Sequence, residues 1–317
     1  MSQAAVPIAV AHPDRKVFAV LVLLIGIGLG NIQDAFLKQL SGAYPFHQMQ
    51  TLRTAIGLVL TAGWLFWRHG RGVLKGTFAP VLVARGLFLG LGSMCFYLGL
   101  AAMTMADAVS LYFALPLIVV VLSGTVLREH VPAWRWLAAA AGFVGVAVML
   151  RPTAALFDWA SLLPLTASFF YALGNLLTRR VDRSLPPMVT AFYAALSFLA
   201  VSGLVAVVFG GGAFATDVHP SLAFLTRGWA MPTMRDGMVI GLIGVMTFIC
   251  FYAYAEAYRL APPSFVAPYE YSALVWAAGL GFLFFGDLPT MRMLIGSAII
   301  IAAGLFLALA ERRTARP

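Results

Sequence analysis

Four charged residues lie inside apolar stretches of the chain: Asp34, Arg53, Arg85 and Glu270. At the centre of a bilayer such a residue costs roughly 2.5–3.5 kcal/mol on insertion scales, so each needs an opposite charge, hydrogen bonds or a water-filled cavity. Arg85 and Glu270 lie about five and six residues from the same expected end of their stretches, so they share a depth. Facing each other, they would form an ion pair or clamp a zwitterion; a purely structural pairing is an equal alternative.

Asp34 and Arg53 both lie toward the other face of the membrane from Arg85 and Glu270, each in the outer half of its stretch. Asp34 could contribute to a binding site, or Lys38 four residues later could neutralise it. Arg53 is deeper, and its long side chain can reach toward the interface. We expect Arg53 or Arg85 to meet a carboxylate or another acceptor on a substrate, and Glu270 to meet a cation or to carry a coupling proton.

Tyrosines inside the stretches add a second kind of polar group. A tyrosine buried among helices needs a hydrogen-bond partner, which a cavity supplies. Pro268 directly precedes one group of them, and helices broken by proline often mark transporter sites, although a proline can also merely bend a helix. With the charged residues, the expected substrate-binding side chains are Tyr97, Tyr112, Tyr269, Tyr271, Asn175 and Trp276.

The composition shows which elements must hold these residues. Only 10% of the 317 residues are charged, against roughly 25% in a soluble domain, and 62% are apolar. The mean hydropathy is +0.91. We therefore predict an all-α integral membrane protein in contact with membrane lipid, whose ten transmembrane helices cover 17–37, 45–67, 80–101, 107–127, 133–150, 158–178, 188–209, 237–257, 264–285 and 291–310.

The basic residues predict the orientation. With the N-terminus in the cytoplasm, fourteen of the 21 Lys and Arg fall in cytoplasmic segments and five outside, which is a strong positive-inside bias. Both termini are then cytoplasmic, and the bacterial inner membrane is the expected location. The basic residues form no stripe with interleaved aromatics, so nucleic acid is not an expected partner.

The ten helices divide into two sets of five. Glu129 and Pro132 precede a Gly-containing closing helix in the first set, as Asp287 and Pro289 do in the second, although any two loop-to-helix junctions can look alike. Because five is odd, similar halves would cross the membrane in opposite senses, as in transporters with inverted repeats. The expected units are a tail (1–16), two five-helix repeats (17–150 and 151–310) and a second tail (311–317).

Seven short segments occur in a recognisable order along the chain: Asp34-Ala35-Phe36-Leu37-Lys38, Arg85-Gly86-Leu87, Met105 to Val109 with Pro116, Arg135-Trp136 with Gly142 to Val146, Ala257-Tyr258-Arg259, Val266-Ala267-Pro268 and Phe285-Gly286-Asp287. Together they resemble EamA-type members of the drug/metabolite transporter superfamily. The resemblance runs from about residue 17 to 310, and one departure is Asp287, where the family often has Glu. It implies ten helices in two inverted five-helix repeats around a central cavity, and relatives that carry amino acids, riboflavin, S-adenosylmethionine or drugs.

We therefore expect a secondary transporter for a small polar, zwitterionic or amphipathic metabolite, working by alternating access as a monomer or homodimer. No nucleotide-binding loop is present, so ATP would not drive it directly. A membrane-embedded enzyme or a sensor is the alternative. The five histidines are scattered in tails, loops and helix ends, so we expect no catalytic cluster, metal or cofactor.

Overall fold

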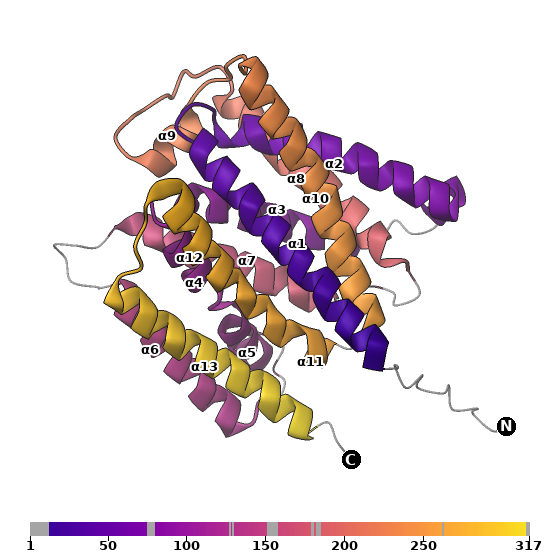
Figure 1. Cartoon of the computed structure of the whole chain (residues 1–317), viewed down its shortest axis with the longest axis vertical. Coiled ribbons are helices and arrows are strands. Elements are labelled where there is room, and N and C mark those ends of the chain that lie inside the picture. The colour runs from indigo at the N-terminus through magenta and orange to yellow at the C-terminus, as the bar shows by residue number, and fades with distance from the viewer. Residues whose placement is uncertain are drawn as a thin grey trace.

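Long apolar stretches separated by short polar turns fold into antiparallel helices, seen in the computed structural model of the chain (Figure 1). The structure describes residues 13–74, 80–126, 128, 130–150, 158–178, 181, 185–261 and 263–314. Their α-helices are α1 (Pro13–Leu40), α2 (Phe46–His69), α3 (Pro80–Leu100), α4 (Met105–Tyr112), α5 (Leu115–Thr125), α6 (Ala133–Leu150), α7 (Leu162–Thr178), α8 (Pro187–Phe209), α9 (Pro220–Thr226), α10 (Met234–Leu260), α11 (Pro263–Val266), α12 (Ser272–Phe285) and α13 (Met291–Thr314). Three 3-10 helices join them: η1 (Arg71–Leu74), η2 (Trp159–Ser161) and η3 (Ala267–Tyr271).

Seven of these segments are long and apolar enough to cross a membrane, where the sequence predicted ten. They are Val17–Leu40, Pro80–Leu100, Met105–Thr125, Ala133–Leu150, Trp159–Thr178, Pro187–Phe209 and Met234–Leu260. Tyr269–Phe285 and Met291–Leu307 are apolar but shorter. The expected second span corresponds to α2, whose 24 residues include several polar side chains that lower its hydropathy.

The first and last helices are longer than the sequence predicted. α1 begins at Pro13 and α13 continues to Thr314, so both helices extend into the predicted tails. The boundary between the predicted repeats, at 150/151, adjoins residues 151–157, which lie outside the described residues. Leu127 and Glu129 of the first proline-containing turn lie outside them as well.

Two of the expected helices are broken, both next to a proline. The fourth expected helix divides into α4 and α5 at Phe113 and Ala114, with Pro116 as the second residue of α5. The ninth divides into α11, η3 and α12, with Pro268 as the second residue of η3. Proline has no N–H to donate and its ring displaces the carbonyl one turn back, so the regular helix ends there. The predicted break around Pro268 is confirmed.

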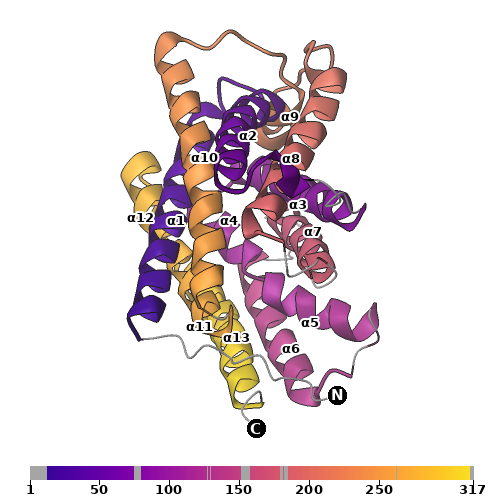
Figure 2. The same cartoon turned by 90° about the vertical axis from the view of Figure 1, so that its right-hand side faces the viewer.

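When each broken helix is taken as one, successive long helices run in opposite directions and meet at two ends of the bundle. We call the end that holds α9 the α9 end; it also carries residues 41–45, 101–104, 158–161, 210–233 and 286–290 (Figures 1 and 2). Local capping fixes its turns: the Thr104 and Thr233 side chains accept from Asp107 N (3.1 Å) and Asp236 N (3.2 Å). Gly286 ends α12 at φ 68°, which glycine adopts without strain. α1 begins and α13 ends at the opposite end.

Small residues allow the helices of the two halves to pack closely. A Cβ atom on Gly26 of α1 would lie 2.9 Å from Ala253 Cβ of α10, and one on Gly86 of α3 would lie 2.2 Å from Ser197 Oγ of α8. In lipid the hydrophobic effect does not drive helices together, so van der Waals contact at such sites supplies the attraction. The Gly26 and Gly86 faces are therefore helix contacts.

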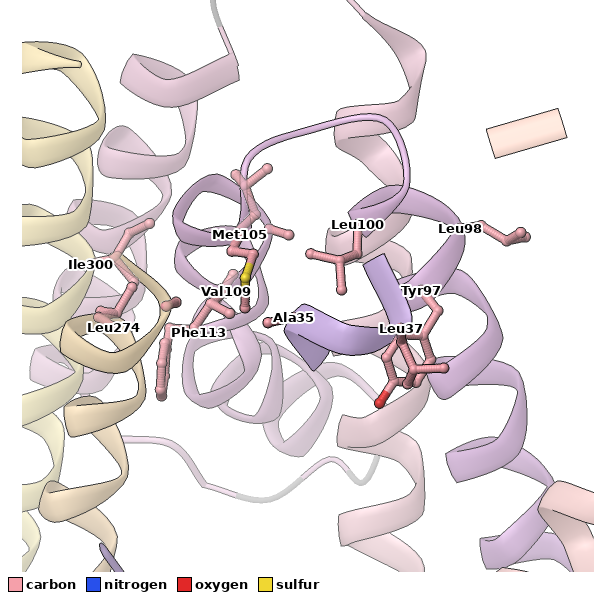
Figure 3. Close-up of a cluster of buried hydrophobic side chains, with 14 of the residues drawn as sticks. Ala35, Leu37, Tyr97, Leu98, Leu100, Met105, Val109, Phe113, Leu274 and Ile300 are labelled. Atoms are coloured by element: carbon pink, nitrogen blue, oxygen red, sulfur yellow. The ribbon is translucent and has the colours of Figure 1, made fainter. Parts of the chain in front are cut away.

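A buried apolar cluster fills the bundle toward the α9 end. It contains Leu100 of α3 (1% exposed), Met105 of α4 (0%) and Ile300 of α13 (1%), together with side chains of α1 and α12 (Figure 3). Tyr97 points from α3 along one side of the same cluster. The cluster thus packs helices from both halves of the chain against one another.

Candidate functional site

Asp34, Arg53 and Tyr97 meet in one hydrogen-bonded network between α1, α2 and α3. The Tyr97 hydroxyl donates to Asp34 Oδ1 at 2.8 Å and accepts from Arg53 Nη1 at 3.0 Å. The Arg53 guanidinium also lies over the Tyr97 ring, 4.5 Å from its centroid, which is a cation–π contact. The structure therefore brings together three of the residues that the sequence singled out.

Two glutamines complete the surroundings of Arg53, which is 4% exposed. Gln50 Oε1, one turn earlier on α2, accepts from Arg53 Nε (2.9 Å) and Nη2 (2.5 Å). The Gln33 amide is assigned in the orientation that satisfies both of its neighbours: Oε1 then accepts from Arg53 Nη1 at 2.7 Å, and the amide nitrogen donates to Thr247 Oγ1 of α10 at 2.7 Å. Four of the five guanidinium N–H groups are thus satisfied by protein.

Five polar side chains lie deep in the bundle next to this network. Asp34, Tyr112, Tyr171, Tyr254 and Glu270 each keep part of their surface accessible to solvent. From this combination of depth and accessible surface we infer an internal space among the five side chains, which we call the hollow. The five come from α1, α4, α7, α10 and η3, and therefore from both halves of the chain.

Both carboxylates reach the same aromatic side chains. Asp34 and Glu270 are each close enough to interact electrostatically with the hydroxyls of Tyr112 and Tyr254. The Tyr112 ring packs edge-on against that of Tyr171, with centroids 5.3 Å apart. The two carboxylates thus share the same tyrosine neighbours.

Glu270 reaches the hollow because its helix is broken. It belongs to η3, the 3-10 turn between α11 and α12, and one of its oxygens, Oε1, accepts a hydrogen bond from the Tyr258 hydroxyl of α10. Each carboxylate has a second oxygen, Asp34 Oδ2 or Glu270 Oε2. Neither oxygen has a hydrogen-bond partner within the described part of the chain, and neither is fully buried. Both oxygens therefore keep accessible surface, and we place them on the hollow.

Arg85 lies elsewhere. Its Nε donates to Thr178 Oγ1 at the end of α7, at 2.8 Å, and its helix packs on α7 and α8. Among the described residues, Arg85 and Glu270 form no ion pair, so the pairing considered from their common depth is not formed in this conformation.

Lys38 does not neutralise Asp34, which was the structural alternative for that residue. Lys38 Nζ instead donates to the Met103 carbonyl at 2.6 Å and to Asp287 Oδ2 at 3.4 Å, and it lies over the Phe285 ring. It therefore connects α1 to two turns at the α9 end.

The other predicted binding residues lie around the hollow's periphery or on the surface. Tyr271 stacks on Phe113, with centroids 4.7 Å apart, and its hydroxyl lies against Gly304 of α13. Tyr269 is 40% exposed and Asn175 is exposed.

Trp276 belongs to α12, and its side chain lies against α1. It is 41% exposed, and its indole packs over Gly28. Roles for Trp276 and the other peripheral residues in substrate binding stay predictions.

The α9 end of the bundle is covered by the segment 210–236, which follows α8, contains α9 and ends in the first turn of α10. Its backbone is bonded to the start of α2: Gln48 donates to the Ala230 carbonyl (2.6 Å) and accepts from its amide (3.1 Å). The Trp229 indole N–H donates to His47 Nδ1 at 2.6 Å. His47 is fully buried in this contact, so it anchors the connection.

Aromatic side chains link this cover to the charged network. The Phe46 ring lies 5.9 Å from that of Phe224 on α9 and 6.4 Å from that of Tyr97, measured between centroids. The Tyr44 hydroxyl adds a hydrogen bond to Asp236 Oδ2, at 2.7 Å. Phe46 thus joins the cover to Tyr97 of the network.

Several residues of the site were not among the expected binding residues. Tyr171 and Tyr254 line the hollow, Tyr258 holds Glu270, and Gln33 and Gln50 hold Arg53. The spacing of Tyr254 and Tyr258, four residues apart on one helix face, could have pointed to them. In the described residues no group of three or more His, Cys, Asp or Glu is arranged to hold a metal ion.

The model of the EamA-like transporter family matches two successive segments of the chain, residues 17–151 and 158–309. The chain belongs to the EamA-like transporter family. Helices of the two matched segments line the hollow together. It is thus a multi-pass membrane protein of a transporter family, related to the drug/metabolite transporters that the sequence resembles.

Relatives of this EamA-family chain are named for different cargoes. It is 31% identical to a riboflavin transporter of Vibrio cholerae over 66% of this chain and 64% of that one, so less than two thirds of that relative is matched. It is 26% identical to an S-adenosylmethionine uptake transporter of Rickettsia prowazekii, over 92% of each chain. A pseudopaline exporter of Pseudomonas aeruginosa is 24% identical over 90% of this chain and 93% of its own.

One solved crystal structure has the same fold. It superposes with a TM-score of 0.63 at 19% identity, covering 94% of this chain and 99% of that one. The family supports transport of a small molecule, and its differing relatives leave the substrate open.

Proposed function

We propose that this protein is a secondary transporter that carries a small polar, zwitterionic or amphipathic metabolite through the internal hollow. The observation that carries the proposal is the set of accessible polar groups at depth, from Asp34 in the first half to Glu270 in the second. Transporter sites lie near the bilayer midplane between repeats and use broken helices such as η3.

Ten membrane-crossing segments in two inverted five-helix repeats, α1–α6 and α7–α13, would give this site its alternating access. The helix contacts support that symmetry. α1 packs on α10 in the same way that its equivalent α7 packs on α3, and α3 packs on α8 as α10 packs on α2. The helix pairs α2 with α8 and α6 with α13 map onto themselves. A match of one family model to two successive segments also agrees with a duplication.

The α9 end would face the outside of a bacterial inner membrane, and both termini would face the cytoplasm. The distribution of basic residues supports this orientation. The hydrogen bonds of Gln48 and His47 to the segment 210–236, with the Lys38–Asp287 pair, would then close the outer side. Rocking one repeat against the other would break them and open the hollow outward.

Relatives carry riboflavin, S-adenosylmethionine or pseudopaline, so substrates of these kinds are the first to test. Glu270 would meet a cationic group of the substrate, or would carry a coupling proton in its place. We propose no resident cofactor, and a monomer or homodimer as the working unit.

Flux into proteoliposomes tests the proposal. Purified protein is reconstituted, and uptake of labelled riboflavin, S-adenosylmethionine and amino acids is measured with and without an imposed pH gradient, against protein-free liposomes. Saturable uptake of at least one compound supports transport, and acceleration by the gradient supports proton coupling. No uptake or counterflow of any compound would contradict the proposed function.

A further inference from the structure

Carboxylate oxygens and tyrosine side chains are the polar groups of the hollow. Asp34 Oδ2 and Glu270 Oε2 have no partner within the described part of the chain and keep accessible surface. Tyr112 and Tyr254 lie within electrostatic range of both carboxylates, and Tyr171 lies within range of Asp34. Carboxylates and tyrosine rings both attract positive charge.

The cations that the sequence singled out are committed to other groups in the described part of the chain. Four of the five N–H groups of Arg53 bind Gln50, Gln33 and Tyr97. Arg85 binds Thr178 at the end of α7.

Lys38 is likewise engaged, with Asp287 and the Met103 carbonyl at the α9 end. A substrate carboxylate could reach the Tyr112 and Tyr254 hydroxyls, but it would meet no uncommitted cation among the described residues. A substrate cation, by contrast, meets free carboxylate oxygens.

The charges do not balance either. Arg53 lies close enough to Asp34 for an electrostatic interaction and is joined to it through Tyr97. Glu270 has only the hydroxyl of Tyr258 as a partner among the described residues, and no cation. A buried carboxylate without a counter-charge is costly, so a bound positive group would be favoured beside it.

We infer that the hollow selects substrates that bear a positive group such as an ammonium or sulfonium, with Glu270 as the principal counter-charge and the tyrosine rings as its walls. This inference rests on the proposed function and narrows the substrate class of the same site. It also revises the sequence-based expectation that Arg53 or Arg85 binds a substrate carboxylate. A cation would bind without breaking any of the hydrogen bonds of the network.

A matched pair of compounds tests the inference. S-adenosylmethionine and S-adenosylhomocysteine differ by one methyl group and by the positive charge on sulfur. Binding to the purified protein and competition for uptake in proteoliposomes are measured for both. We expect the sulfonium compound to bind about tenfold or more tightly, since a desolvated cation gains from both the carboxylate and the rings.

Choline and 3,3-dimethylbutan-1-ol form a second pair: they have the same shape, but the positively charged nitrogen of choline is replaced by a neutral carbon. Riboflavin serves as a further neutral ligand. Glu270→Gln should bring the ratio within each pair close to one. Glu256→Gln is the matched control, because Glu256 is already paired with the exposed Arg259 side chain and should leave the ratio unchanged.

The two members of each pair are first compared on the unmutated protein, so this part of the test does not depend on whether Glu270→Gln folds. Equal binding of both members, preference for the neutral member, or an unchanged ratio in a folded Glu270→Gln variant overturns the inference while transport itself stands. If no compound in the panel binds or crosses the membrane, the proposed function fails and the inference fails with it.

Discussion

Replacing Arg53 with methionine removes a cation and four hydrogen bonds from the interior of the bundle. Two of these bonds, to Tyr97 and Gln33, join α2 to other helices. Hydrogen bonds between membrane helices contribute about 0.6 kcal/mol each on average, so the two together contribute about 1.2 kcal/mol. Asp34 also loses its electrostatic partner. Removing one member of a buried charge pair costs roughly 3–5 kcal/mol, and we expect Arg53→Met to fall in that range.

A double-mutant cycle separates the charge from the hydrogen bonds. Asp34→Asn removes the negative charge but keeps an acceptor for Tyr97, so it should cost less than Arg53→Met. If the two charges compensate each other, the double variant should be more stable than the sum of the single costs predicts, by about 1–3 kcal/mol. Reversible unfolding in mixed detergent micelles measures the free energy of each variant.

The surface pair Glu256–Arg259 provides the matched control for this cycle. Its Arg259 side chain is 60% exposed and the residues lie three apart on α10. Such a pair couples by no more than about 0.5 kcal/mol. A coupling energy between Asp34 and Arg53 as small as that of the control pair would refute the idea that the network compensates charge inside the bundle.

Two further predictions concern packing and the cover at the α9 end. Gly86→Ala should destabilise the protein by about 1–3 kcal/mol, because the new Cβ would lie 2.2 Å from Ser197 Oγ, whereas Gly63→Ala, with open space around it, should be nearly neutral in the same unfolding assay. Gln48→Ala removes both hydrogen bonds to Ala230 and should speed amide hydrogen exchange across residues 226–233 several-fold without unfolding the bundle; unchanged exchange would show that the anchor contributes nothing.

The sequence located the polar interior well. Asp34, Arg53 and Glu270 could be singled out because a charge in an apolar stretch is costly wherever the helix packs. Tyr97 and Tyr112 followed from the need of buried tyrosines for partners, and both lie at the network or the hollow. The break near Pro268 followed from the missing N–H of proline.

Helix rotation could not be predicted in the same way. Depth along a helix follows from counting residues, but the direction of a side chain depends on how the helix packs. Arg85, for example, faces Thr178 because α3 packs on α7. In η3 consecutive residues turn by about 120°, so three neighbours face three ways. Glu270 borders the hollow, Tyr271 faces α13 and Tyr269 is largely exposed.

Transport through the hollow is tested most directly by two tyrosines of α10 that are two residues apart and face opposite ways. Tyr254 borders the hollow, whereas Tyr252 is 36% exposed and packs on Trp64. Initial uptake rates into proteoliposomes are compared for Tyr254→Leu and Tyr252→Leu at equal reconstituted amounts. We predict that Tyr254→Leu slows uptake about tenfold or more while Tyr252→Leu transports at the parental rate; equal rates in the two folded variants would contradict transport through the hollow.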